Sequence, residues 1–133
     1  MHEFAVRSKS RTQMIDITSE VRRAIEESNV QGGVCHVFTP HTTAGITINE
    51  NADPDVTVDL VNELNKIVPF EDGYRHMEGN SAAHLKSTLT GCSETVIINS
   101  NRAVLGTWQG IYFCEFDGPR TRRVCVKIIS DER

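Results

Sequence analysis

The sequence predicts an α+β fold, a single-domain sandwich in which a mixed, largely antiparallel sheet carries two or three helices. Two observations predict this class. Strand-like segments, with apolar residues at period two or in short runs, are mixed with segments whose apolar residues recur at helical spacing. The last third of the chain is strand-like throughout, which favours an antiparallel meander over regular alternation of strands and helices. A length of 133 residues without a repeat or linker predicts one domain over residues 1–133.

The first half of the chain is predicted to contain four strands and one helix. Thr18 or Ser19 is the predicted N-cap of this helix, because a hydroxyl at that position accepts a hydrogen bond from an amide of the first turn. Gly32 and Gly33 end the helical region. The predicted elements are strands over 4–8, 14–17, 33–39 and 46–49, and a helix over 18–28.

Two further helices are predicted in the middle of the chain. Asp53 suits the N-cap and Pro54 suits the first helical position, where the missing N–H costs no hydrogen bond. The helix that they start has apolar residues at helical spacing and ends before Pro69. A shorter helix, from about residue 80 to residue 89, is stopped by Gly91.

The last third is predicted to form strands connected by tight turns. Ser100-Asn101-Arg102 is a predicted hairpin turn, in which Asn101 adopts a positive φ because asparagine tolerates that region. The predicted strands cover 94–99, 103–106, 109–116 and 121–129.

Composition and charge exclude several classes of protein. The net charge of −4 argues against a general nucleic-acid binder, since phosphate backbones require a basic face. No apolar run approaches the roughly 20 residues that a membrane span needs. The N-terminus lacks a basic segment followed by an apolar one, so no secretory signal is expected. We therefore expect a cytoplasmic protein that binds neither membranes nor nucleic acid.

The cysteines and the charge clusters are open to more than one interpretation. Four cysteines without C-x-x-C spacing are expected to be reduced, three of them as small apolar residues within strands. Eight acidic residues fall between Glu50 and Glu78, and Arg120, Arg122 and Arg123 stand close together near the C-terminus. These clusters are either solvated surface or a cation site and an anion site, and composition does not decide between the two.

Three of the five histidines are candidate functional residues. His41, His76 and His84 each lie in a polar setting at the edge of a predicted element. Imidazole is the commonest transition-metal ligand, and three of them with one open position make a catalytic type of metal site. On one continuous helix His76 and His84 would be too far apart to share an ion, but a helix start after Gly79 lets His76 fold back toward His84. The alternative is that these histidines lie on the surface or support other residues.

Other polar residues suggest anion binding and acid–base chemistry. The segment 39–45 is a dense polar turn whose threonine hydroxyls and amides are suited to holding a phosphate, or simply to closing the turn. Glu50 is not needed as a cap, so it is the better candidate for a base than Asp53. Arginines after the Asp117-Gly118-Pro119 turn are able to clamp a phosphate, or to balance nearby acids.

Taken together, these motifs resemble one family, the YjbQ-like family. The resemblance covers nearly the whole chain and rests on several uncommon motifs in the right order. They are Thr39-x-His41-Thr42-Thr43-Ala44, Asn49-Glu50-x-x-Asp53, Arg75-His76-x-x-x-Asn80-x-x-x-His84, Gly106-Thr107-Trp108-Gln109 and Glu115-x-Asp117-Gly118-Pro119-Arg120-x-Arg122.

The resemblance implies a compact α+β domain that assembles as a homotrimer, with sites near subunit boundaries. It also implies a divalent metal ion, zinc or a similar ion, held by His41, His76 and His84, with magnesium as the alternative for a pyrophosphate substrate. The implied activity is that of a secondary thiamine-phosphate synthase, a transferase that joins a pyrimidine diphosphate to a thiazole phosphate. For this chemistry we assign His84 and Glu50 as catalytic residues. The predicted phosphate-binding residues are Thr42, Thr43, Asn80, Gln109, Arg120 and Arg122.

Three functions are therefore compatible with the sequence. The first is a metal-dependent enzyme that acts on a small phosphorylated metabolite, with thiamine-phosphate synthesis as one activity. The second is a metal-assisted hydrolase that uses the same histidines to activate water. The third is a non-catalytic trimeric protein that binds a metal or a phosphorylated metabolite.

Overall fold

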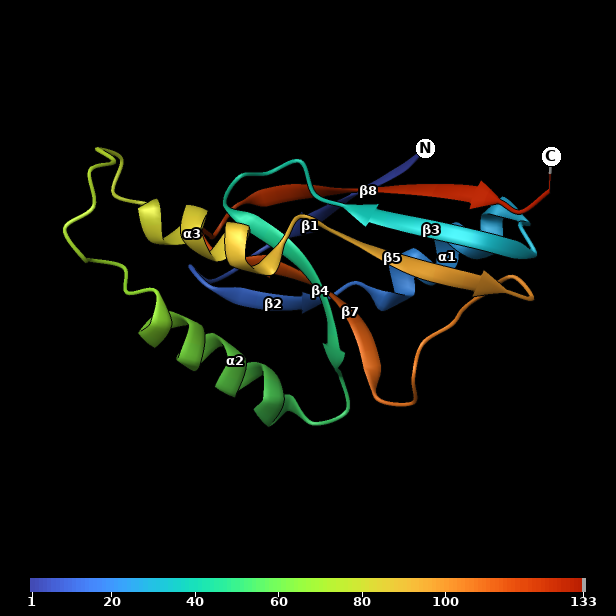
Figure 1. Cartoon of the computed structure of the whole chain (residues 1–133), viewed down its shortest axis with the longest axis horizontal. Helices are drawn as coiled ribbons and strands as arrows, with labels where there is room; N and C mark the ends of the chain where they lie inside the picture. Colours follow the sequence, from blue (N-terminus) through green and yellow to red (C-terminus); the bar gives the residue numbers. More distant parts are fainter. Residues whose placement is uncertain (133) are drawn as a thin grey trace.

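The computed structural model of the protein describes residues 1–132, which form eleven helices and strands (Figure 1). In chain order these are β1 (His2–Arg7), β2 (Gln13–Asp16), α1 (Thr18–Ser28), β3 (Gly32–Phe38), β4 (Ala44–Glu50), α2 (Pro54–Ile67), α3 (Ser81–Thr90), β5 (Ser93–Asn99), β6 (Arg102–Ala103), β7 (Gln109–Glu115) and β8 (Thr121–Ser130).

The chain combines three helices with strands that form two sheets, which confirms the predicted α+β class. One sheet has five strands in the order β1-β8-β3-β5-β6, and the other has three in the order β2-β7-β4. Every strand pairing within residues 1–132 is antiparallel, whereas the sequence predicted a mixed, largely antiparallel sheet. The consecutive strands β7 and β8 belong to different sheets, so the link between them crosses from one layer to the other (Figure 1).

The two sheets enclose the main hydrophobic core, and α1 closes it. Val21, Ala24 and Ile25 of α1 enter this core at helical spacing. Along the strands, alternate side chains face inward, as Val96 and Ile98 of β5 do. Side chains from both sheets and from α1 therefore pack in one hydrophobic core.

A second, smaller cluster lies on the other face of the three-stranded sheet. Tyr112, Cys114 and Phe116 extend from β7 and its end toward this face, where Ala83 of α3 covers them and Leu64 of α2 packs against them. The strand β7 is therefore buried on both faces. No residue of α2 is fully buried, although its apolar positions recur at helical spacing.

Most predicted element boundaries agree with the structure, with two corrections. Asp53 caps α2 as predicted, because its Oδ1 accepts a hydrogen bond from the amide of Asp55 at 2.9 Å. The predicted cap of α1 is wrong: Thr18 is already helical, and its hydroxyl donates to Asp16 and accepts from the amide of Ile111. The predicted strand 103–106 is wrong in extent, since β6 covers only two residues.

The hairpin between β5 and β6 confirms the prediction for Asn101, whose φ is +60°. Its Nδ2 donates hydrogen bonds to the carbonyl groups of Ile25, at 2.9 Å, and Val30, at 2.7 Å. The side chain thereby ties the hairpin to the end of α1.

Asn101→Ala is expected to lower the free energy of unfolding by about 2 kcal/mol, because it removes both hydrogen bonds and places alanine at a positive φ. Asn101→Gly keeps the backbone conformation and is expected to cost about 1 kcal/mol. Urea denaturation of the two variants and the unmodified chain measures both values. Equal stability of all three chains would contradict this explanation.

Within residues 1–132, no helix combines the length and apolar character that crossing a membrane requires.

Candidate functional site

An open cleft of about 440 Å³ lies where three connecting segments meet. These are the β3–β4 loop, the segment leading into the first turns of α3, and the link from β7 to β8. Of the ten residues that the sequence predicted for the site, eight line this cleft: His41, Thr42, Thr43, His76, Asn80, His84, Arg120 and Arg122. Residues up to 81 positions apart in the sequence therefore meet at one place.

Hydrogen bonds fix the walls of the cleft to one another. The hydroxyl of Ser87 in α3 donates to the carbonyl of Ala44 at 2.6 Å, where β4 begins. Nδ2 of Asn80, just before α3, donates to Asp117 in the β7–β8 link at 2.9 Å. The amide of Thr39 donates to the carbonyl of Cys92, just beyond α3, at 2.9 Å. The helix is thus held against both loops.

A buried ion pair between Arg122 and Glu115 lies beneath the surface of the cleft. The guanidinium of Arg122 donates to both carboxylate oxygens of Glu115, and to the carbonyl and hydroxyl oxygens of Thr43. Burial alone raises the pKa of Glu115, but hydrogen bonds from Arg122, Asp117 and Ser8 hold it below its ordinary value. The sequence predicted that Arg122 and Thr43 bind a phosphate. In the structure they bind each other instead, so these groups are not available to a phosphate.

His41 lies in the cleft as a neutral side chain. Its Nε2 accepts a hydrogen bond from the amide of Arg123 at 3.0 Å, so the proton of the neutral ring is on Nδ1. Burial and the positive charges of Arg122, Arg123 and Arg120 lower the pKa of His41, with Glu115 opposing them. The electrostatic environment of this ring therefore favours an anion.

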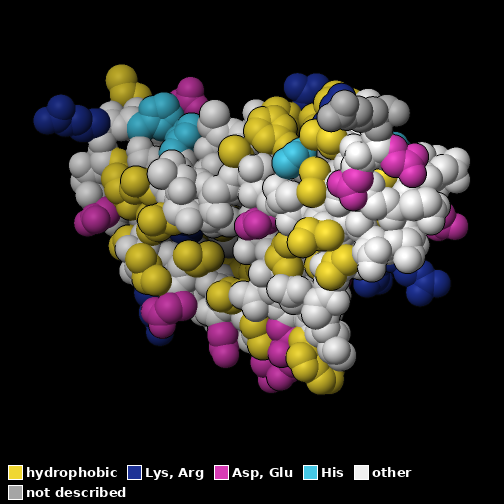
Figure 2. Space-filling view, turned by 45° about the vertical axis from the view of Figure 1, so that its right-hand side comes forward, with side chains coloured by type: hydrophobic (Ala, Val, Ile, Leu, Met, Phe, Trp, Pro, Cys, Tyr) yellow, Lys and Arg dark blue, Asp and Glu magenta, His cyan; other side chains and the backbone are white. Residues whose placement is uncertain are grey.

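His76 and His84 lie beside each other, as predicted for a helix that starts after Gly79. Their ring centroids are 5.4 Å apart, and the rings meet edge to face. His84 is in α3, whereas His76 is in the loop before it, with Nε2 3.8 Å from a carboxylate oxygen of Glu78. In Figure 2, two histidine side chains lie next to each other at the upper left of the molecule.

These histidines do not fit a metal ion in this arrangement. A zinc site needs three or four ligand atoms directed at one point. Within the described part of the chain, no group of three or more His, Cys, Asp or Glu side chains is placed to hold an ion. The Nε2 atom of His41 is occupied by the amide of Arg123, and the nearby arginines repel a cation. The divalent metal ion at these histidines thus has no support from the geometry of one chain and stays a prediction.

Arg120 and the start of α3 provide donors at the open side of the cleft. Arg120 is about half exposed, and its Nη2 donates to Asp117 at 3.2 Å, so other N–H groups of the guanidinium remain free for a ligand. Asn80 is the N-cap of α3 but makes no capping hydrogen bond with its side chain, and the first turn contains no acidic residue. The acidic group at this end of the helix comes instead from the β7–β8 link, where the carboxylate of Asp117 accepts from the side chain of Asn80.

Glu50 and Gln109 do not take part in this cleft within one chain. They pair with each other at one end of the β4–β7 ladder, whereas Ala44 and Glu115 pair at the end beside the cleft. The two ends are six residue steps apart along β4, which is about 20 Å. Oε1 of Gln109 accepts a hydrogen bond from the amide of Gly106 and so closes its own turn. The predicted catalytic role of Glu50 therefore has no geometric support within one chain.

Sequence reasoning did not select two acidic residues of the cleft, Asp117 and Glu78. The sequence places Asp117 in the turn Asp117-Gly118-Pro119, where it is expected only to balance the charge of the arginines. Its hydrogen bonds to both Asn80 and Arg120 show that it orients two of the predicted ligand-binding residues. In the sequence, Asp117 can be recognised by its position between an apolar strand and the arginines.

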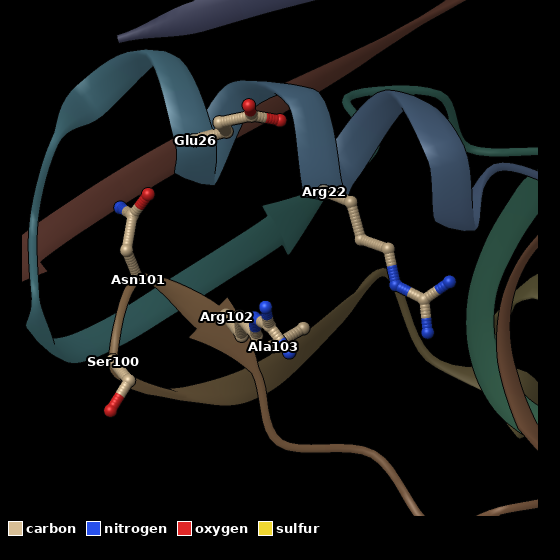
Figure 3. Close-up of a pocket in the computed structure, with 6 residues that line it drawn as sticks. All are labelled: Arg22, Glu26, Ser100, Asn101, Arg102 and Ala103. Carbon is tan, nitrogen blue, oxygen red and sulfur yellow. The ribbon is translucent and has the colours of Figure 1, made fainter.

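A second hollow, of about 600 Å³, lies between α1 and the β5–β6 hairpin (Figure 3). Arg22 extends toward it from α1 and Arg102 from β6, with Glu26 on the helix above. The hairpin lies at one end of the β3–β5 pair, and Phe38 lies at the other end, close to the loop that carries His41. The hollow is therefore remote from the histidines. None of the predicted site residues lines it.

Comparison with known proteins agrees with the family that the motifs indicated. A sequence model described as "UPF0047 protein YjbQ-like" matches residues 2–131. The chain belongs to the UPF0047 YjbQ-like family. Among its relatives, UPF0047 protein MJ1081 of Methanocaldococcus jannaschii is 50% identical over 132 residues, which is 99% of this chain and 96% of that protein. UPF0047 protein YugU of Bacillus subtilis is 52% identical, over 94% of this chain and 96% of that protein.

Solved structures of similar proteins have the same fold. An uncharacterised conserved protein of the family from Clostridium acetobutylicum matches with a TM-score of 0.96 and 55% identity, covering 97% of this chain and all of that one. The conserved hypothetical protein TT1486 from Thermus thermophilus matches with a TM-score of 0.90 and 38% identity, covering 97% of this chain and all of that one. Neither name states an activity.

Proposed function

We propose that the chain is an enzyme that acts on a small phosphorylated metabolite, and that the phosphate binds in the cleft around His41. The observation that carries this proposal is the convergence of three histidines, Arg120 and the N-terminus of α3 in one open cleft. Arginine, backbone amides at a helix start and imidazole N–H groups are donors that recognise phosphate oxygens.

The residues of the cleft have distinct roles in this proposal. Arg120 and the N-terminal end of α3 at Asn80 bind the phosphate, while Asp117 holds Arg120 and Asn80 in position. Thr42 lines the same cleft and supplies a hydroxyl at its rim. Arg122 and Thr43 act indirectly, because their hydrogen bonds to each other and to Glu115 fix the loop that carries His41.

The chemistry that we propose is a transfer in which phosphate or pyrophosphate leaves. In a thiamine-phosphate synthase-like reaction, the thiazole nitrogen forms a bond to the methylene carbon of the pyrimidine substrate as the bond from that carbon to the pyrophosphate oxygen breaks. Negative charge then grows on the leaving group, where Arg120 stabilises it and His84 donates a hydrogen bond. His76 lies beside His84 and completes the donor set. No step in this scheme passes through a metal ion.

We further propose that the enzyme works in the cytoplasm as a homotrimer, as the family resemblance implies. A trimer offers one route by which Glu50 and Gln109 of one subunit approach the cleft of another.

The test is turnover of a pyrimidine diphosphate with a thiazole phosphate, followed by mass spectrometry of the products. We expect Arg120→Ala and His84→Ala to lower kcat/KM at least about tenfold, the loss of one charge-stabilising donor. His36→Ala is the matched control, because His36 lies in β3 outside the cleft and contacts Thr95. The assay is run with EDTA and with added zinc or magnesium, so that a required ion is detected.

Three outcomes would overturn parts of this proposal. Hydrolysis of the diphosphate without joined product would indicate a hydrolase instead. Turnover that His84→Ala leaves unchanged, together with weaker phosphate binding, would indicate a non-catalytic binding protein. Turnover that requires the added ion would show that a metal takes part, held either by the histidines or by the pyrophosphate of the substrate.

A further inference from the structure

Another cavity adjoins the proposed phosphate-binding cleft and has a different chemical character. Its volume is about 540 Å³, and it shares Pro40, His41, Thr42 and His84 with the cleft. We call the part beyond these shared residues the side lobe, and its walls are Phe38, Thr39, Ser87, Thr88, Gly91 and Cys92. None of these six side chains is charged.

The polar groups of the side lobe are largely used within the protein. The hydroxyl of Ser87 donates to the carbonyl of Ala44, and the hydroxyl of Thr39 donates to the carbonyl of Arg123. The carbonyl of Cys92 accepts from the amide of Thr39. A ligand group in the side lobe therefore meets few free donors or acceptors and gains mainly from burial of apolar surface.

The side lobe also has an exposed apolar wall and open space. Phe38, at the end of β3, leaves 41% of its surface exposed. A Cβ atom placed on Gly91, whose φ is +93°, would meet no atom within 4 Å. Thr88 lies one helical turn after His84, so both residues face the same side of α3. His84 thus stands at the boundary between a polar cleft and an apolar lobe.

We propose that the side lobe is the subsite for the organic part of the phosphorylated substrate, and that it selects a compact, largely apolar ring. This inference rests on the proposed function, because the phosphate must occupy the adjoining cleft. His41 and His84 line both spaces, so the ester oxygen of such a ligand would lie beside these two residues. The enzyme then distinguishes such esters from inorganic phosphate and from phosphorylated sugars by burial of the ring.

Calorimetric titration with phenyl phosphate and with inorganic phosphate tests this inference. We expect phenyl phosphate to bind at least about tenfold more tightly, from the apolar area that the ring buries. Thr88→Phe fills the side lobe and is expected to abolish this advantage while the Kd for inorganic phosphate stays within about twofold. Leu89→Phe is the matched control, because Leu89 is 64% exposed and does not line the lobe.

Cys92 provides a second measurement that does not depend on the Thr88 variant. Within residues 1–132, Cys92 is the only cysteine with an exposed side chain. Burial raises the pKa of the thiols of Cys35, Cys114 and Cys125, which keeps them protonated and slow to react. We therefore expect a maleimide to label Cys92 first, and phenyl phosphate to slow this labelling more than inorganic phosphate does.

The possible results separate the two proposals. If inorganic phosphate binds and Arg120→Ala weakens it, but phenyl phosphate gains nothing and leaves Cys92 labelling unchanged, the side-lobe inference is wrong and the phosphate cleft stands. If neither compound binds, the proposed function is wrong, and the side-lobe inference falls with it. If phenyl phosphate binds equally well to the Arg120→Ala variant, the ring does not share its site with the phosphate, which also overturns the inference.

Discussion

Replacing Glu115 with glutamine is expected to lower the free energy of unfolding by about 3–5 kcal/mol, as for other buried ion pairs that lose one partner. Glu115 has no exposed surface in its side chain, and that of Arg122 is 3% exposed. The variant would leave the guanidinium charge buried without a counter-charge. The hydroxyl of Ser8 and the amide of Asp117 each donate to a different carboxylate oxygen, so one of them would also lose its acceptor.

A double variant and an exposed ion pair provide the controls. Glu115→Gln combined with Arg122→Met removes both charges, and we expect it to be more stable than Glu115→Gln alone. Glu3→Gln breaks the pair with Arg123, which spans 3.8 Å between half-exposed side chains, and is expected to cost no more than about 1 kcal/mol. A double variant no more stable than Glu115→Gln would show that the unpaired charge is not the cause.

The same carboxylate makes the fold sensitive to acid. The pKa of Glu115 is lowered in the folded protein from an ordinary value of 4.5. Its contribution to stability is therefore fully present above the ordinary pKa and is lost as the pH falls through the lowered, folded value. In chemical denaturation between pH 7 and pH 3, the unmodified chain is expected to lose more stability than Glu115→Gln.

Lys86 is expected to have the opposite pH dependence. Its side chain is fully buried in α3, where it donates to Asn65 of α2 and lies over the ring of Phe70, 4.0 Å from the centroid. Burial, and then the positive charge of Arg11, lower the pKa of Lys86 from 10.5 to about 8. The charged amine is thus less favourable in the folded protein than in the unfolded chain.

The direction of the effect follows from proton binding. Between the folded pKa and the unfolded pKa, the unfolded chain binds more protons, so stability rises with pH. The full difference corresponds to about 3 kcal/mol, of which about 2 kcal/mol is gained between pH 7 and pH 9.5. Lys86→Met removes the titrating group but keeps an apolar chain of similar length, so its stability is expected to lack this rise.

Urea denaturation at pH 7 and pH 9.5 measures this difference. Lys66→Met is the matched control, since Lys66 is exposed near the end of α2 and its loss is expected to leave the rise intact. If the free energy of unfolding changes equally with pH in the unmodified chain and in Lys86→Met, the pKa of Lys86 is not lowered by folding.

Much of the fold and part of the site were predictable from local patterns. Helix starts such as Asp53-Pro54, and the positive φ of Asn101, depend on a few neighbouring residues, so the sequence identified them correctly. The meeting of His76 with His84 was predictable because both lie within one short segment. The position of His41 beside them depends on strand pairing over long distances, and for that residue the family resemblance was the better guide.

The role of Arg122 was predicted less well, although the sequence held a signal. Spacing placed Arg120 and Arg122 together as phosphate ligands. In β8, however, Arg122, Val124 and Val126 alternate onto the same buried face, so Arg122 points inward and pairs with Glu115. Period two therefore distinguishes Arg122 from the exposed Arg123, whereas Arg120 lies before β8 and outside this alternation. For Glu50, only the register of β4 against β7 shows that it lies far from the histidines.

The burial of β7 on both faces couples the two layers of the protein. Ile111 and Phe113 fill the main core, while Tyr112, Cys114 and Phe116 fill the cluster under α2 and α3. Displacement of this one strand exposes both sets of side chains at once. The sandwich and the helical layer that carries His84 therefore share one cooperative transition, and the geometry of the cleft persists for as long as the core does.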